Sequence, residues 1–219
     1  MNMIKNFITV FFLVSFTACG SSGGSSATVI DIDSLAAAAK LDAPWAGETE
    51  GTLDGSNSIS ISDEIVFAID VVFSEANTFD AQLGPNVNEV IEINKVITSS
   101  KGGSANIKGT LTFTSGADTF PFYQKIDLAI DFSGYTQTSI ASSENDISLH
   151  GSFTYTGGGT FSSLLSVDID RIIDGGYSYK DSSGVYNIAT KIVTFDSLEN
   201  AATVNKTRKY TVNGQKYTK

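Results

Sequence analysis

The chain has 219 residues, a formal net charge of -10, one cysteine and one histidine. A lone cysteine forms no internal disulfide, and one histidine in no recognisable motif makes a poor metal site, so the sequence indicates neither a disulfide scaffold nor a zinc protein. The acidic balance argues against nucleic acid as a partner and against direct adhesion to anionic lipid headgroups.

The first residues are typical of an export signal. Lys5 supplies a positive charge, and the apolar and small polar run FITVFFLVSF follows at residues 7–16. This run is too short for a membrane span, which needs about 20 apolar residues, so we expect it to be removed. The four residues around the end of the signal, Phe16, Thr17, Ala18 and Cys19, resemble the lipobox of bacterial lipoproteins, although Phe16 stands where that family usually has leucine.

The resemblance implies that Cys19 is diacylated on its sulfur and becomes the first residue of the mature chain. Residues 1–18 are then the signal peptide, residues 19–30 the lipidated cysteine with a Gly/Ser-rich tether, and residues 31–219 a single β-rich domain. Because Gly20 rather than aspartate follows Cys19, the resemblance also implies the outer membrane as the location. An ordinary signal peptide with an incidental cysteine is the alternative interpretation.

The segment after the tether changes its hydrophobic period. Residues 33–41 carry helix formers behind a capping Asp33 or Ser34, and Pro44 follows, so they predict one short helix. In residues 59–73 every odd position except Asp63 is apolar and several even positions are polar, which predicts one or two half-buried strands. No second helix is expected.

An internal repeat organises the middle of the chain. Residues 106–135 and 148–177 align without a gap, which places Gly109 on Gly151 and Gly134 on Gly176. Both segments alternate apolar residues with threonine or serine, so a hairpin unit used twice is the interpretation, and chance similarity between Thr-rich strands is the alternative. A turn is predicted at the glycines 157–159.

The last residues predict a hairpin, because Asn213 and Gly214 supply the positive φ angles of a type I′ turn. This tail is basic, and either it docks an acidic surface or a glycan, or its lysines keep a solvated sheet edge from pairing with other strands. The fold class that follows is all-β: an antiparallel sheet with repeated hairpin units, curled into a barrel, half-barrel or sandwich, plus one short N-terminal helix.

Four features of the sequence are candidates for a catalytic or ligand-binding role. His150 lacks a catalytic partner and is predicted to be exposed on a polar strand face. The glycines 157–159 lack the following helix that a phosphate cradle needs. Asp168, Asp170 and Asp174 suggest calcium, but Ile172 occupies a ligand position, so the first two are assigned to the wet side of a strand.

Aromatic residues are the fourth feature. Trp45 with Tyr177, Tyr179 and Tyr186 is either a sugar platform or packing, and packing is the usual role of scattered aromatics in sheets. The sequence thus predicts no catalytic, cofactor-binding or metal residue, and Cys19 is the one site residue, through lipidation.

Two functions from different classes remain. The first is a lipid-anchored envelope domain without catalysis, with a structural or interaction role and a protein or glycan partner. The alternative is a carrier or chaperone for an apolar, lipid-like ligand held in a concave sheet face. The apolar positions of residues 120–132 are predicted to be core rather than cavity lining, because no broad apolar helix is available as a lid.

Overall fold

The computed structural model describes residues 31–76, 90–115, 122–163, 166–199 and 202–219. The predicted signal peptide, Cys19 and the tether lie outside these residues. Within them the chain forms two helices and one eight-stranded sheet. The helices are α1 (Ile32–Asp42) and α2 (Gly55–Ala76). The strands are β1 (Val90–Thr98), β2 (Ser104–Ser115), β3 (Phe122–Thr138), β4 (Asp146–Ser163), β5 (Ser166–Asp181), β6 (Gly184–Glu199), β7 (Ala202–Val212) and β8 (Gln215–Thr218).

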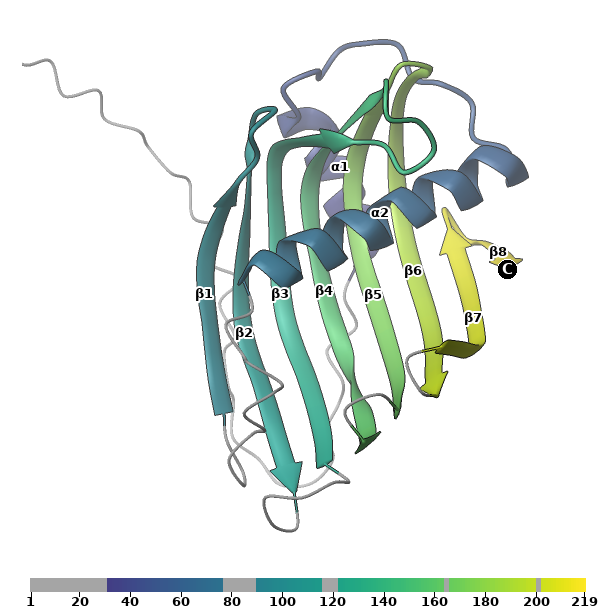
Figure 1. Ribbon diagram of the computed structural model, residues 1–219. Coiled ribbons are helices and arrows are strands. Elements are labelled where there is room, and N and C mark those ends of the chain that lie inside the picture. Colours follow the sequence, from purple (N-terminus) through teal and green to yellow (C-terminus); the bar gives the residue numbers. More distant parts are fainter. Residues whose placement is uncertain (1–30, 77–89, 116–121, 164–165, 200–201) are drawn as a thin grey trace, which may run out of the picture.

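The sheet is an antiparallel meander in which every strand pairs with the next one in the chain, from β1 to β8. It curves strongly, and α2 lies across its concave face (Figure 1). The described strands do not close into a barrel, since β1 and β8 are the two ends of the strand order. The predicted, mostly antiparallel sheet is therefore confirmed, whereas a closed barrel is not formed.

Helix α2 corrects the prediction of strands at residues 59–73. Its buried residues include Ile61, Ile65, Ile69 and Val72, which recur at helical spacing and face the sheet. Asp54 caps the first turn, because its Oδ1 accepts hydrogen bonds from the backbone N–H of Ser56 (2.8 Å) and Asn57 (2.9 Å). The segment is rich in β-branched residues, whose intrinsic propensity favours strands. Burial of one helix face against the sheet overrides that propensity.

Helix α1 confirms the predicted short helix, with a different cap. Asp31, rather than Asp33 or Ser34, caps it by accepting a hydrogen bond from the backbone N–H of Ser34 (3.2 Å). The helix packs on the convex face so closely that a Cβ added to Gly176 would lie 2.1 Å from the backbone nitrogen of Ala36. The contact explains why β5 has a glycine beneath the helix.

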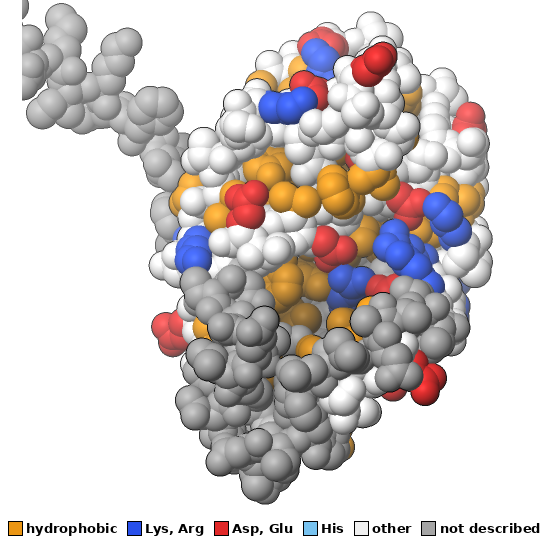
Figure 2. All heavy atoms as spheres, in the orientation of Figure 1, with side chains coloured by type: hydrophobic (Ala, Val, Ile, Leu, Met, Phe, Trp, Pro, Cys, Tyr) orange, Lys and Arg blue, Asp and Glu red, His pale blue; other side chains and the backbone are white. Residues whose placement is uncertain are grey.

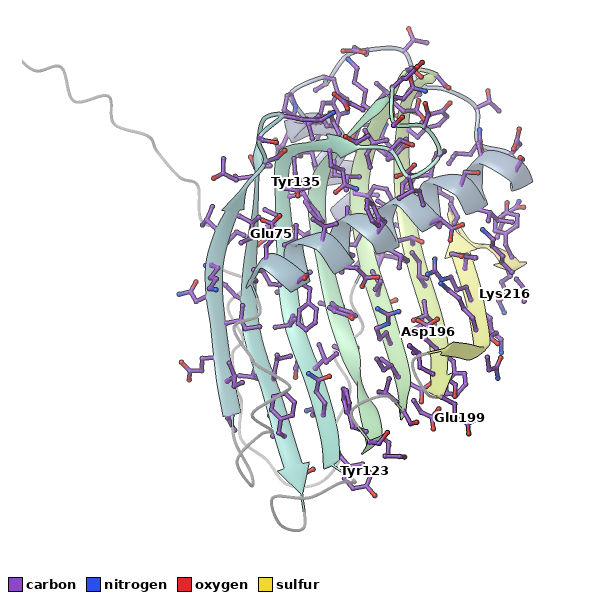
Figure 3. The ribbon with its side chains drawn as sticks, in the orientation of Figure 1. Glu75, Tyr123, Tyr135, Asp196, Glu199 and Lys216 are labelled. Carbon is purple, nitrogen blue, oxygen red and sulfur yellow. The ribbon has the colours of Figure 1, made fainter. Side chains whose placement is uncertain are left out.

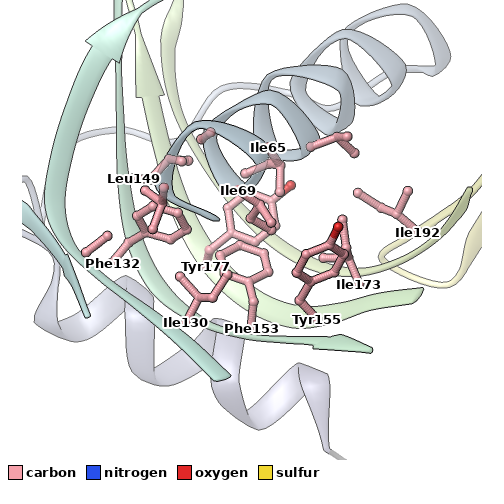
Figure 4. Close-up of a cluster of buried hydrophobic side chains, with 14 of the residues drawn as sticks. Ile65, Ile69, Ile130, Phe132, Leu149, Phe153, Tyr155, Ile173, Tyr177 and Ile192 are labelled. Carbon is pink, nitrogen blue, oxygen red and sulfur yellow. The ribbon is translucent and has the colours of Figure 1, made fainter. Parts of the chain in front are cut away.

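The core lies between α2 and the concave face (Figure 4). Ile65 and Ile69 of α2 are fully buried against aromatic and aliphatic side chains of the central strands. From the apolar set predicted at residues 120–132, the described side chains are all buried: Ile126, Leu128, Ile130 and Phe132. The expectation that no broad apolar helix exists is wrong, because α2 is that helix.

The two repeat segments fall on the β2–β3 and β4–β5 hairpins. Gly109 and Gly151, which the repeat aligns, have nearly the same positive φ, 139° and 141°. The predicted turn at residues 157–159 is wrong: these glycines lie inside β4 and pair with β3 and β5 on either side. The predicted terminal turn is confirmed, with φ of 46° at Asn213 and 79° at Gly214.

Candidate ligand-binding site

The concave face has two chemically different halves. On β2 and β3 it presents buried apolar side chains, among them Leu111, Phe113 and Ile126. On β5 to β7 it presents charged side chains beside the apolar ones, and Asp196 lies on β6 below α2 (Figure 3). Figure 2 shows hydrophobic side chains gathered in a hollow below α2, beside a group of charged ones.

Arg171 of β5 is the centre of the first charged cluster. Its Nη1 donates to Oδ1 of Asp70 on α2 (2.8 Å), and its Nη2 donates to Asp196 on β6. Its Nε donates to Oγ1 of Thr194 (3.2 Å), and Nη1 also lies 3.4 Å from the hydroxyl of Tyr155. One guanidinium thus joins the helix to three strands.

Burial and charge compete in this cluster. Burial raises the pKa of Asp70, and the nearby Arg171 only partly offsets that effect. Burial lowers the pKa of Arg171, but its contacts with Tyr155 and Asp70 outweigh that effect and raise the pKa, so the guanidinium stays charged. Burial also raises the pKa of Tyr155, which keeps its proton. Burial of the charged form of Asp70 therefore costs free energy, which Arg171 offsets only in part.

Asp63, two turns earlier in α2, is the centre of the second cluster. Its carboxylate accepts hydrogen bonds from Nη1 of Arg208 (2.9 Å), the hydroxyl of Tyr210 (2.6 Å) and Nζ of Lys219 (2.5 Å). Burial alone would raise the pKa of Asp63, but these three hydrogen bonds outweigh it and lower the pKa. The helix is thus fastened to β7 and to the end of the chain.

A cavity of about 270 Å³ adjoins the second cluster, and its described lining consists of Asp63, Lys206, Arg208 and Lys219. Strand alternation explains the lining, because Lys206 and Arg208 share the concave face of β7 with Tyr210, while Lys209 points to the convex side. The predicted basic tail is therefore divided between the two faces of the sheet.

A second cavity, of about 340 Å³, lies at the other rim of the concave face, between the start of α2, the β3–β4 loop and the β5–β6 turn. Glu64 closes one side of it, because its carboxylate accepts hydrogen bonds from the Ser139 hydroxyl and from the backbone N–H of Ile140 (3.1 Å) and Ala141 (3.3 Å). These contacts hold the loop against α2. We assign Glu64 a structural role.

The structure does not bring the other residues singled out in the sequence into this site. His150 is half-buried rather than exposed, its Nδ1 lacks a hydrogen-bond partner among the described residues, and burial lowers its pKa. Asp168 and Asp170 are exposed, as predicted. No group of three or more acidic, histidine or cysteine residues in the described ranges is arranged to hold a metal ion.

The aromatic residues are packing residues. Trp45 lies on the convex face, where its Nε1 donates to Oγ of Ser178 (2.7 Å), and it packs in a cluster with Ala43 and Val185. Tyr177 and Tyr179 alternate with Ser178 on β5, so they lie on the concave face, within the main core. The sheet separates Trp45 from the tyrosines, so these side chains form no common sugar platform.

The site was missed in the sequence because its charges come from distant positions. Asp63 and Asp70, seven residues apart in an apolar helix, are the one local signal, since that spacing puts both on one helix face. Neither helix of the described chain has the length and apolar composition of a membrane-crossing segment. No protein-family model, curated protein or solved structure matches the chain.

Proposed function

We propose that the protein is a non-catalytic binding protein of the bacterial envelope, anchored by lipid at Cys19, which carries an apolar, lipid-like ligand on the concave face of its half-barrel. One observation carries this proposal: a single helix crosses an open, curved sheet, and hydrophobic side chains floor a hollow beside it (Figure 2). Concave, mostly apolar surfaces with a few placed polar groups are the usual sites for small ligands.

The residues at the lower end of β4 and β5 support the proposal. Gly157 and Gly159 supply no side chain there, and their strand neighbours Phe161 and Ile169 are only half-buried. Ile169 and Ile172 lie on opposite faces of β5, and Ile172 is on the convex face. These two isoleucines offer a matched pair of positions at which to test the two faces.

The ligand is tested with the full chain carrying Cys19→Ser, which has no acylated sulfur. We expect native mass spectrometry of this chain, purified from a bacterial host, to show a bound lipid. Ile169→Ser should weaken the binding of the uncharged fluorescent probe N-phenyl-1-naphthylamine about tenfold, because it removes apolar contact area worth roughly 1–2 kcal/mol. Ile172→Ser should leave probe binding unchanged. Absence of both lipid and probe binding would favour the structural or interaction role.

The anchor is tested separately, in the native host. The unaltered chain should fractionate with the outer membrane at the size expected for cleavage before Cys19, because two or more acyl chains hold a protein on a bilayer stably. Cys19→Ser should yield an uncleaved or soluble form. A serine variant that stays membrane-bound at mature size would disprove the anchor without affecting the ligand proposal.

A further inference from the structure

Three cations converge on the cavity at the β7 end of the concave face. Lys206 and Arg208 are alternate residues of β7, so both face the cavity. Lys219 joins them because its backbone pairs with Arg208, with N–H to O distances of 2.9 and 3.1 Å in the two directions. The sheet register therefore assembles this group from two chain segments.

The cations exceed the negative charge available to them. Asp63 is the one acidic side chain among the described lining residues, and it already accepts hydrogen bonds from Arg208, Tyr210 and Lys219. Asp196 lies across from Lys206 on β6, but its carboxylate binds Arg171. Lys206 itself is exposed and has no ion pair within the described residues.

One residue that lines the cavity has a donor without an acceptor. The Nε of Arg208 is buried and has no hydrogen-bond partner within the described chain. A buried donor without a partner is costly, and a charged oxygen acceptor satisfies it best, especially with a second donor from the same guanidinium. Carboxylates and phosphates have this geometry.

We infer that this cavity binds the anionic oxygen group, carboxylate or phosphate, of an amphipathic ligand whose apolar part occupies the hollow towards β2–β4. This inference rests on the proposed carrier function and specifies its ligand class. The position of the cavity supports it, because its cations come from β7 and the last residue, on the side of the concave face where Figure 2 shows basic side chains beside the hydrophobic hollow. A ligand that spans both halves must have a charged end and an apolar end.

The test compares three probes on the full chain carrying Cys19→Ser: oleate, oleyl alcohol and inorganic phosphate, each titrated by calorimetry. Oleate should bind about tenfold or more tightly than oleyl alcohol, because a charge-assisted hydrogen bond distinguishes the two. Lys206→Ala should remove most of that difference while leaving oleyl alcohol binding unchanged. Because Lys206 is exposed and has no ion pair in the described ranges, its removal is not expected to unfold the chain.

Lys209→Ala is the matched control, since Lys209 is on the same strand but faces the convex side. It should leave oleate binding unchanged, whereas an equal loss would reduce the effect to general electrostatic attraction and overturn the inference. Equal affinities for oleate and oleyl alcohol would overturn the anionic site but keep the carrier function. Phosphate binding that depends on Lys206, without binding of either long-chain probe, would contradict the inference that the ligand is amphipathic. Binding of none of the three would overturn both proposals.

Discussion

On β2 to β4 the concave face meets α2 through apolar side chains, whereas on β5 to β7 it meets the same helix through charged side chains as well as apolar ones. The apolar half can bury its surface in any orientation that excludes water, because the hydrophobic effect is not directional. The charged half needs fixed donor and acceptor positions, because an unpaired buried charge is costly. The comparison indicates that one half mainly stabilises the helix on the sheet, while the other fixes its register.

The largest expected effect comes from the apolar half. Leu128→Ala should lower the free energy of unfolding by about 2–5 kcal/mol, because it leaves a cavity beneath a side chain that is 2% exposed. Urea denaturation measures this change. Val96→Ala is the control, since Val96 is 65% exposed on β1 and its truncation should have little effect. An unchanged melting temperature together with lost probe binding would place Leu128 in the ligand cavity instead.

A smaller loss is expected from the charged half. Arg171→Met should lower the free energy of unfolding by about 2 kcal/mol, because it leaves Asp70 and Asp196 close together without their shared partner. Adding Asp70→Asn to this variant should restore part of the loss, which a double-mutant cycle would measure. No recovery in the double variant would show that Arg171 acts through packing alone. Lys125→Met, which removes an exposed ion pair, should change little.

The smallest effect is a difference in pH dependence between the two aspartates of α2, below about 1 kcal/mol for each after solvent screening. The folded-state pKa of Asp63 is lowered, so its contribution is complete above its ordinary value of 3.8 and is lost as the pH falls below that value. The folded-state pKa of Asp70 is raised, so protonation of Asp70 stabilises the fold as the pH falls towards 3.8.

The two variants should therefore change the acid side of the stability curve in opposite directions. Asp63→Asn should flatten the fall in stability at low pH, and Asp70→Asn should steepen it. Urea midpoints measured from neutral pH to about pH 3 test this contrast. Parallel curves for both variants would contradict the assignment of opposite environments to the two aspartates of α2.

The apolar half was largely predictable and the charged half was not. The alternation at residues 126–132, which only Ala129 interrupts, indicates a sheet with one buried face, since successive strand side chains point to opposite faces. Residues 65–73 are apolar at nearly every position, so period two and period 3.6 both fit them, and the β-branched content favoured the wrong one. The Asp70–Arg171–Asp196 cluster joins residues far apart in the chain, and no local pattern reveals such contacts.

The conformation of the glycines in β4 was likewise not predictable from the local sequence. Three consecutive glycines ordinarily indicate a turn, yet residues 157–159 are held in the middle of a sheet by strands on both sides. Backbone pairing with two neighbours supplies the order that the side chains do not. The extended conformation of these glycines therefore depends on β3 and β5, which lie outside the local sequence.

The position of α2 in the chain has a consequence for the order of folding. Each strand pairs with its successor, so the sheet can grow by adding one hairpin after another in chain order. Helix α2 precedes every strand of the sheet, yet it contacts both β1 and β7. During synthesis its apolar face therefore emerges before the strands that cover it, and docking of the helix is complete only after β7 has joined the sheet.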